Sequence, residues 1–125
     1  MNPIFEELHS HIEARTARLA VIGLGYVGLP MAIEFAHAGY PVVGIDNDTR
    51  RVDQLKEGRS YILDVSEKQI RDCGEKLTAT NNFRALIEAE VVVICVPTPL
   101  RKTKDPDLSY ILSATQEISK YLHKG

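Results

Sequence analysis

Residues 19 to 28 read Leu-Ala-Val-Ile-Gly-Leu-Gly-Tyr-Val-Gly, and Asp46 closes the next apolar run. A short apolar strand, a glycine-rich turn, the start of a helix and an acidic residue follow one another in the order that a dinucleotide-binding βαβ unit requires. Gly23 permits a tight turn, Gly25 lets the backbone approach a pyrophosphate, and Gly28 lets the helix pack close to the strand. The stretch therefore predicts an α/β fold of the Rossmann type.

Asp46 and the first turn of the following helix supply the expected binding chemistry. Backbone N–H groups at the start of a helix attract phosphate, and the helix dipole adds about 0.3–1 kcal/mol for a negative charge. Asp46 would accept hydrogen bonds from the 2′- and 3′-hydroxyls of a ribose and would repel a 2′-phosphate. The pattern therefore favours NAD over NADP as the cofactor.

On either side of this motif, short apolar runs typical of strands alternate with segments in which apolar residues recur at helical spacing. Right-handed crossovers place the strands in the order 3-2-1-4, in a doubly wound parallel sheet that is truncated after about four strands. The run from Val91 to Val96 is continuously apolar, which is typical of a parallel strand covered on both faces. The expected strands are 19–23, 42–45, 77–80 and 91–96, and the expected helices are 26–37, a helix around Val52 and Leu55, 66–73, 83–89 and 108–122.

A separate helix is expected at the N-terminus, within residues 1–17, ahead of a domain over residues 18–125. Ile4, Phe5, Leu8 and Ile12 recur at helical spacing, which predicts an amphipathic helix. Such a helix would cover an edge of the sheet or the core, and an interaction helix is the alternative.

Composition narrows the class of protein. The 125 residues carry a formal net charge of −2, which gives no reason to expect a nucleic acid or an anionic membrane as partner. The longest apolar run is too short to span a bilayer, and the N-terminus lacks the pattern of a secretory signal. Cys73 and Cys95 lack metal-ligand spacing, and His9 and His11 point to different faces of a helix. We therefore expect a cytoplasmic domain without a metal site.

Four further segments resemble one enzyme family. Residues 23–30 (Gly-Leu-Gly-Tyr-Val-Gly-Leu-Pro), 44–46 (Gly-Ile-Asp), 94–100 (Ile-Cys-Val-Pro-Thr-Pro-Leu) and 106–110 (Pro-Asp-Leu-Ser-Tyr) are similar to the NAD-binding half of nucleotide-sugar 6-dehydrogenases. Ser-Tyr-Ile at 60–62, followed by Asp64-Val65, resembles the UDP-N-acetylhexosamine branch rather than the UDP-glucose branch of that family.

The resemblance implies an activity and a set of cofactor contacts. Enzymes of this family oxidise the C6 hydroxyl of a UDP-sugar to a carboxylate through a cysteine-bound intermediate, reduce two NAD in succession, and serve polysaccharide biosynthesis. The resemblance places the glycines beside the pyrophosphate, Asp46 and Arg51 at the adenosine ribose, and the Val-Pro-Thr segment on the other side of the cofactor. The candidate cofactor-binding residues are Gly23, Gly25, Tyr26, Val27, Gly28, Asp46, Arg51, Val96, Pro97 and Thr98.

Several candidate residues have a simpler interpretation. Arg51 would also suit a solvated helix face, and packing is the simpler role for Tyr26 and Leu24. Cys95 is expected in the core because it lies in an apolar run, whereas Cys73 is expected as a surface or half-buried thiol. The basic loop of Arg101, Lys102 and Lys104 suits solvent, although it could attract a diphosphate.

No catalytic residue is expected in this chain. The catalytic cysteine, lysine, asparagine and glutamate-bearing loop that the resemblance implies have no counterpart here, so the substrate and catalytic domains are expected to be absent and the chain to bind NAD without turnover. An exposed apolar edge at the fourth strand would favour a homo-oligomer, or coverage by the N-terminal helix.

Two alternative functions stay open from the sequence. A stand-alone module that senses NAD or adenine nucleotides could use the same half-site. Dehydrogenases of 3-hydroxyacids or 6-phosphogluconate also begin with a glycine-rich turn, but they fit the Tyr-Val-Gly-Leu-Pro continuation poorly.

Overall fold

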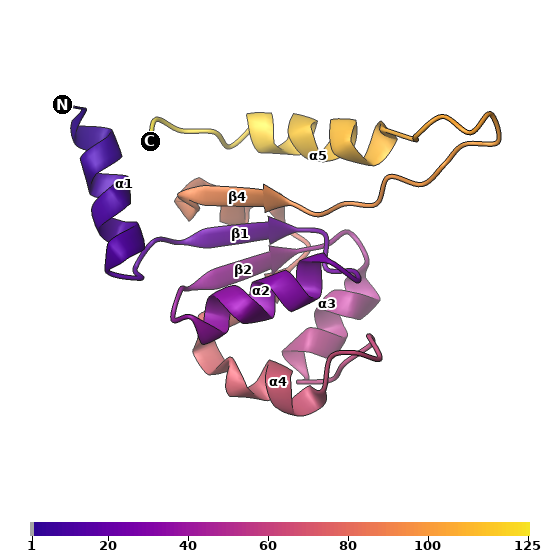
Figure 1. Ribbon diagram of the computed structural model, residues 1–125, viewed down its shortest axis with the longest axis horizontal. Helices are drawn as coiled ribbons and strands as arrows, with labels where there is room; N and C mark the ends of the chain where they lie inside the picture. The colour runs from indigo at the N-terminus through magenta and orange to yellow at the C-terminus, as the bar shows by residue number, and fades with distance from the viewer. Residues whose placement is uncertain (1) are drawn as a thin grey trace.

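Four parallel strands form a single sheet, and the computed structural model, which describes residues 2–125, orders them β3-β2-β1-β4 (Figure 1). The order agrees with the prediction from right-handed crossovers. The register is the same on both sides of β1, since Leu19 lies opposite both Val42 and Val91. The strands are β1 (Leu19–Ile22), β2 (Val42–Ile45), β3 (Leu77–Thr80) and β4 (Val91–Ile94).

Helices alternate with the strands as expected. Local sequence sets several helix ends: Ser66 and Gln69 form a reciprocal capping box at the fourth helix, and Asp48 caps the third through the N–H of Arg50. The α-helices are α1 (Pro3–Glu13), α2 (Gly28–His37), α3 (Thr49–Lys56), α4 (Glu67–Asp72) and α5 (Ser109–Ser119), and the 3₁₀ helices are η1 (Gly74–Lys76) and η2 (Phe83–Glu88).

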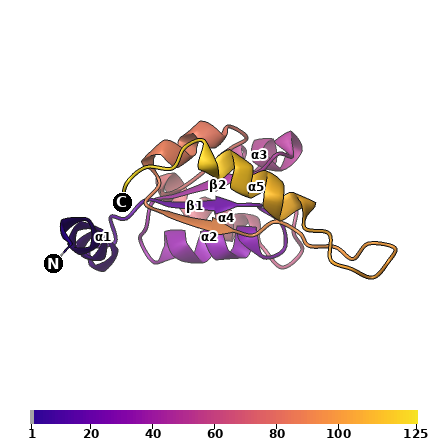
Figure 2. The ribbon, with the colours of Figure 1, turned by 90° about the horizontal axis from the view of Figure 1, so that it is seen from above.

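Helices lie on both faces of the sheet (Figure 2), and the core accordingly has two layers, one on each face. Successive strand residues point to opposite faces, so Val21 packs in the layer that contains Leu29 of α2, whereas Ile22 packs in the layer that contains Leu86 of η2 and Ala114 of α5. Both faces of β1 are therefore buried, and the doubly wound arrangement is confirmed.

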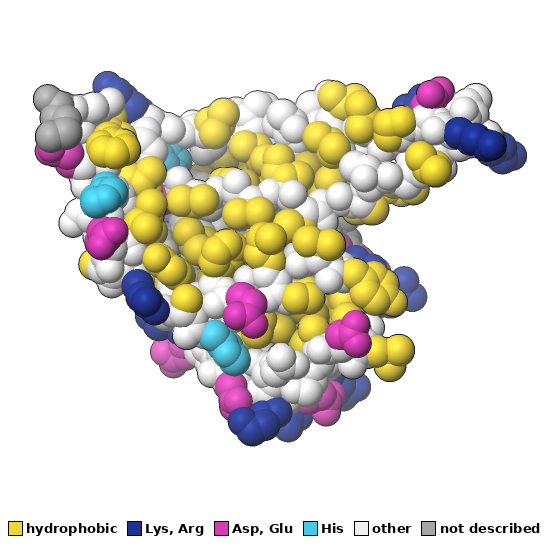
Figure 3. Space-filling view, viewed as in Figure 1, with side chains coloured by type: hydrophobic (Ala, Val, Ile, Leu, Met, Phe, Trp, Pro, Cys, Tyr) yellow, Lys and Arg dark blue, Asp and Glu magenta, His cyan; other side chains and the backbone are white. Residues whose placement is uncertain are grey.

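Strand β4 differs from the expectation of a strand covered on both faces. It ends at Ile94, its residues are only partly buried, and Ile94 itself is 40% exposed. The physical reason is position: β4 pairs only with β1 and forms an edge of the sheet. Figure 3 shows hydrophobic side chains gathered over the region that carries α2, β4 and α5.

The burial of the two cysteines also differs from the expectation. Cys73, expected as a surface or half-buried thiol, is only 5% exposed, because it ends α4 on the side that packs into the first core layer. Cys95 is half-buried against that same layer, with its Sγ 4.0 Å from Sδ of Met31.

Helix α1 covers neither the core nor the edge formed by β4. It has no buried residue and lies beyond the amino ends of the strands (Figure 1). His11 Nδ1 lies 2.7 Å from Glu90 Oε2, and the Tyr40 hydroxyl donates to the carbonyl of Ile12 at 2.8 Å. These polar contacts hold the end of α1 nearest the sheet, while the apolar Phe5 stays exposed. Across residues 2–125, every helix is too short or too polar to cross a membrane.

Candidate dinucleotide-binding site

The turn between β1 and α2 requires glycine at its first and last glycine positions. Gly23 has a φ of +95°, and a Cβ there would lie 2.6 Å from the carbonyl oxygen of Cys95. A Cβ on Gly28 would overlap the carbonyl oxygen of Gly23. Gly23 thus makes the tight turn, and Gly28 lets α2 start directly against it, as the sequence predicts.

The middle of the turn has free space around it, whereas both ends are crowded. A Cβ on Gly25 would meet only the flexible guanidinium of Arg51, at 3.6 Å. Tyr26 is 80% exposed and Val27 is also exposed, so the packing role considered for Tyr26 is wrong. Leu24, by contrast, is fully buried and packs against Gly44, where a Cβ would come within 2.7 Å of Leu24 Cδ2.

Asp46 lies behind this turn, directly after β2. Its side chain is 10% exposed, and Oδ2 accepts the N–H of Leu24 at 2.9 Å while Oδ1 accepts the N–H of Asp48 at 2.8 Å. A carboxylate oxygen can accept more than one hydrogen bond, so Asp46 keeps acceptor capacity for ribose hydroxyls while it anchors the turn.

Arg51 points back from α3 to the same place. Its Nη1 lies 3.3 Å from Asp46 Oδ2, its Nε lies 4.0 Å from Asp48 Oδ2, and its side chain is 42% exposed. The contact with Asp48, three residues earlier, would also form on a solvated helix face, but the contact with Asp46 at the end of β2 would not. The structure therefore brings Arg51 to the glycine turn.

Tyr61 completes the group, and sequence reasoning missed it. Its hydroxyl donates to the carbonyl oxygen of Leu24, and its ring lies under the Arg51 guanidinium, 5.6 Å from Cζ to the ring centre. Burial, together with the nearby Asp46 carboxylate, raises the pKa of Tyr61 far above its usual range, so the hydroxyl stays a donor. The only signal in the sequence was the Ser-Tyr-Ile segment, which carries no spacing relation to the turn.

The segment after β4 reaches the site only in part. Val96 lines a small hollow of about 60 Å³ together with Gly23 and Asp46, at the carboxyl ends of the strands. Pro97 and Thr98 are exposed and lie outside that hollow. The hollow also includes Phe83 of η2 and three residues of α5, which sequence reasoning did not single out: Tyr110, Ser113 and Ala114.

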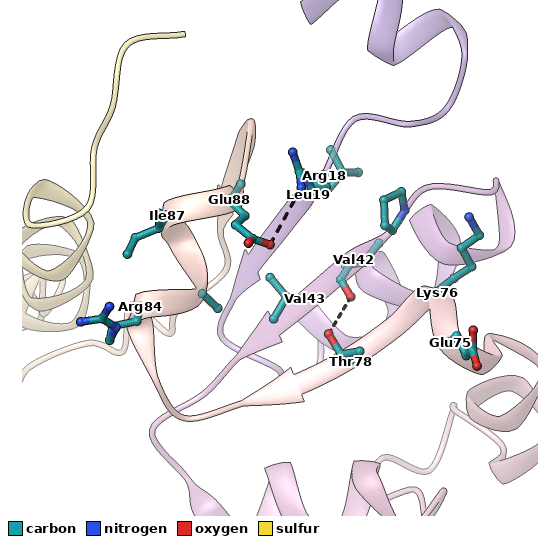
Figure 4. A pocket seen from close by; sticks show the side chains of 13 residues that line it. Arg18, Leu19, Val42, Val43, Glu75, Lys76, Thr78, Arg84, Ile87 and Glu88 are labelled. Carbon is teal, nitrogen blue, oxygen red and sulfur yellow. Dashed lines mark hydrogen bonds and ion pairs between the residues drawn. The ribbon is translucent and has the colours of Figure 1, made fainter.

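A larger hollow, of about 650 Å³, lies at the amino ends of the strands (Figure 4). Its wall includes Val43 and Thr78 of the sheet, and Arg18 pairs with Glu88 across 3.9 Å at its rim. Open parallel sheets bind ligands at the carboxyl ends of their strands, where the glycine turn lies. The smaller hollow beside Gly23 therefore lies at the end of the sheet where such a fold is expected to bind a ligand.

Neither cysteine is activated as a nucleophile. Burial raises the pKa of the Cys95 thiol, and burial together with the Asp72 carboxylate raises that of Cys73. Both thiols stay protonated at neutral pH, which suits packing rather than catalysis. In the basic loop, Arg101 pairs with Asp107 at 3.8 Å, which agrees with the solvated interpretation.

A glycine turn between β1 and α2, with an acidic residue after β2 and helices on both faces of a parallel sheet, defines a dinucleotide-binding domain of the Rossmann type. Residues 17–125 match the UDP-glucose/GDP-mannose dehydrogenase family, NAD binding domain. The chain belongs to this family, and NAD is accordingly its cofactor. The resemblance stated from the sequence is confirmed.

Individual relatives agree with this assignment. The chain is 39% identical over 108 residues to a UDP-N-acetyl-D-glucosamine 6-dehydrogenase of Pseudomonas aeruginosa. The aligned region covers 86% of this chain and 25% of that enzyme. It is 39% identical over 112 residues to a UDP-N-acetyl-D-mannosamine dehydrogenase of Pyrococcus horikoshii, covering 86% and 26%.

Solved structures show the same likeness. A UDP-D-ManNAc dehydrogenase from Pyrococcus horikoshii superposes with a TM-score of 0.81 at 37% identity, over 86% of this chain and 26% of that one. A GDP-mannose dehydrogenase from Pseudomonas aeruginosa gives a TM-score of 0.77 at 33% identity, over 81% and 24%. The chain thus spans about a quarter of the length of these relatives. The comparisons lend no support to a stand-alone sensing module.

Proposed function

We propose that this chain supplies the NAD-binding domain of a UDP-N-acetylhexosamine 6-dehydrogenase, which oxidises the sugar C6 hydroxyl to a carboxylate for polysaccharide biosynthesis. The observation that carries the proposal is the Asp46 carboxylate bonded to the Leu24 amide inside the glycine turn. The substrate class is supported by the UDP-N-acetyl-D-glucosamine and UDP-N-acetyl-D-mannosamine enzymes among the relatives. When bound, NAD would accept hydride from the sugar.

The proposed contacts follow from the geometry. The backbone from Gly25 to Gly28 holds the pyrophosphate, because it has open space at Gly25 and leads into α2, whose N-terminus favours negative charge. Asp46 accepts the ribose hydroxyls, and Arg51 borders the same ribose. Tyr26 and Val27 offer exposed surface beside the phosphates, and Val96, Pro97 and Thr98 lie along the other side of the cofactor.

The wider setting is also a proposal. Residues 18–125 form the binding domain after an N-terminal helical segment, 1–17, and the enzyme acts in the cytoplasm on a UDP-sugar. The exposed apolar surface around β4 supports a homo-oligomer, because an unpaired strand edge is a template for association. Sedimentation equilibrium tests for the homo-oligomer. Detection of monomer alone would contradict this part of the proposal.

Asp46→Asn tests the proposed cofactor contact. The amide keeps one oxygen for the Leu24 N–H but loses the charge, so we expect NAD affinity to fall about tenfold, equivalent to about 1.4 kcal/mol. NADP should gain relative to NAD, because the repulsion of its 2′-phosphate disappears. Isothermal titration calorimetry with both cofactors measures the ratio.

Asp53→Asn, on the same helix as Arg51, is the control for the change in charge. An unchanged ratio of NADP to NAD affinity in Asp46→Asn would contradict the proposed role of Asp46.

A further inference from the structure

Four groups around the glycine turn form a closed cycle of contacts. Leu24 donates its N–H to Asp46, Asp46 pairs with Arg51, Arg51 lies over the ring of Tyr61, and the Tyr61 hydroxyl donates back to the carbonyl of Leu24. The cycle joins the turn to the end of β2, to α3 and to the loop that follows α3. Leu24 is therefore held by both of its backbone polar groups.

Tyr61 is the member of this cycle that closes it from a distance. It lies 37 residues beyond Leu24 in the chain, and it is partly buried against the first core layer. Its ring and its hydroxyl make separate contacts, the ring with a cation and the hydroxyl with a carbonyl. One side chain thus orients both the turn and Arg51.

We propose that Tyr61 is a positioning residue for NAD binding, which holds the Leu24 carbonyl and the Arg51 guanidinium in the arrangement that receives the adenosine half of the cofactor. The inference rests on the proposed contacts of Asp46, Arg51 and the glycine turn. It goes beyond them because Tyr61 itself needs no contact with the cofactor.

The physical reason is preorganisation. Gly25 follows Leu24 and has more conformational freedom than any other residue type, so the peptide between them is free to rotate unless its neighbours hold it. Fixing that peptide before the ligand arrives removes an ordering penalty from binding. A guanidinium over an aromatic face is likewise kept in one place rather than spread over its rotamers.

Two substitutions separate the contributions of the hydroxyl and the ring. Tyr61→Phe removes the bond to Leu24 and keeps the surface under Arg51, and we expect affinity for NAD and for ADP-ribose to fall about fivefold. Tyr61→Leu also removes the aromatic face, and the loss should exceed about tenfold. Calorimetry at a temperature where each variant is folded measures both ligands.

Tyr40→Phe is the matched control. The Tyr40 hydroxyl also donates to a main-chain carbonyl, that of Ile12 at 2.8 Å, but at the amino ends of the strands. We expect this variant to bind NAD within about twofold of the unmodified chain. An equal loss of affinity in Tyr40→Phe and Tyr61→Phe would show general destabilisation and would overturn the proposal.

Amide hydrogen exchange in the ligand-free chain gives a second readout that does not depend on NAD. The Leu24 amide, which donates to Asp46, should exchange faster in Tyr61→Phe and should be unchanged in Tyr40→Phe. Unaltered exchange in Tyr61→Phe, or NAD affinity equal to that of the unmodified chain, would overturn the positioning role. If the unmodified chain binds no NAD, the proposed function fails, while the exchange rates still decide whether Tyr61 holds the turn.

Discussion

At the scale of the residue, the three glycines of the turn do different work although they share one motif. Gly23 is needed for its backbone conformation and Gly28 for the closeness of its neighbour, whereas Gly25 has an ordinary φ and open space around it. A substitution at Gly28 should therefore lower the stability of the fold, whereas one at Gly25 should lower NAD affinity with little change in stability.

Gly28→Ala and Gly25→Ala test that separation. The alanine methyl at position 28 would overlap the Gly23 carbonyl, so we expect a loss of about 2 kcal/mol in the free energy of unfolding, or more. At position 25 the methyl meets only Arg51, so stability should stay within about 0.5 kcal/mol while NAD affinity falls at least about tenfold.

Chemical denaturation and calorimetry give the two quantities for each variant. Equal loss of stability in both variants would contradict the different roles of the two positions.

At the scale of the element, local signals set helix ends and tertiary contacts set burial. The capping box predicted at Ser66 is present at α4, because its two bonds join groups only three residues apart. The amphipathic spacing of α1 correctly predicts a helix, but spacing cannot say which surface the helix meets. In the structure, polar contacts to His11 and to the carbonyl of Ile12 hold α1, and no residue of its apolar face is fully buried.

The attachment of α1 should depend on pH. Glu90 is partly desolvated, which opposes ionisation, but its bonds to His11 and to the Arg18 N–H prevail and lower its pKa. A carboxyl whose pKa is lower in the folded state stabilises that state above its unfolded pKa and loses the contribution as the pH falls through the folded value. We therefore expect α1 to loosen as the pH falls below about 4.3.

NMR chemical shifts of α1 between pH 3 and 7 measure this transition. Glu90→Gln should loosen α1 at pH 7 and flatten the transition. A transition of unchanged size in that variant would exclude Glu90 as its cause.

At the scale of the whole molecule, the described residues contain the parts for binding the adenosine half of NAD but no activated thiol. The glycine turn, Asp46 and Arg51 lie together at the carboxyl ends of β1 and β2. In the Val96–Thr98 segment that follows β4, only Val96 reaches the hollow beside them, and α5 adds Tyr110, Ser113 and Ala114 to its lining. We infer that the chain recognises the ADP portion of NAD.

ADP should compete with NAD nearly on equal terms for binding to the purified polypeptide. Competition calorimetry measures the ratio of the two affinities. A hundredfold preference for NAD over ADP, about 2.7 kcal/mol, would contradict this prediction.

The amino-acid sequence by itself determined the α/β class, the strand order, the glycine turn with Asp46, and the family. These follow from hydrophobic periodicity, turn chemistry and crossover handedness, which are local or nearly local properties. Tertiary structure alone decided that β4 is a partly buried edge, that Cys73 is buried, that α1 stands clear of the core, and that Tyr61 joins the turn. Each of these depends on which segments meet in space, and the contact of Tyr61 with Leu24 spans 37 residues that no spacing rule connects.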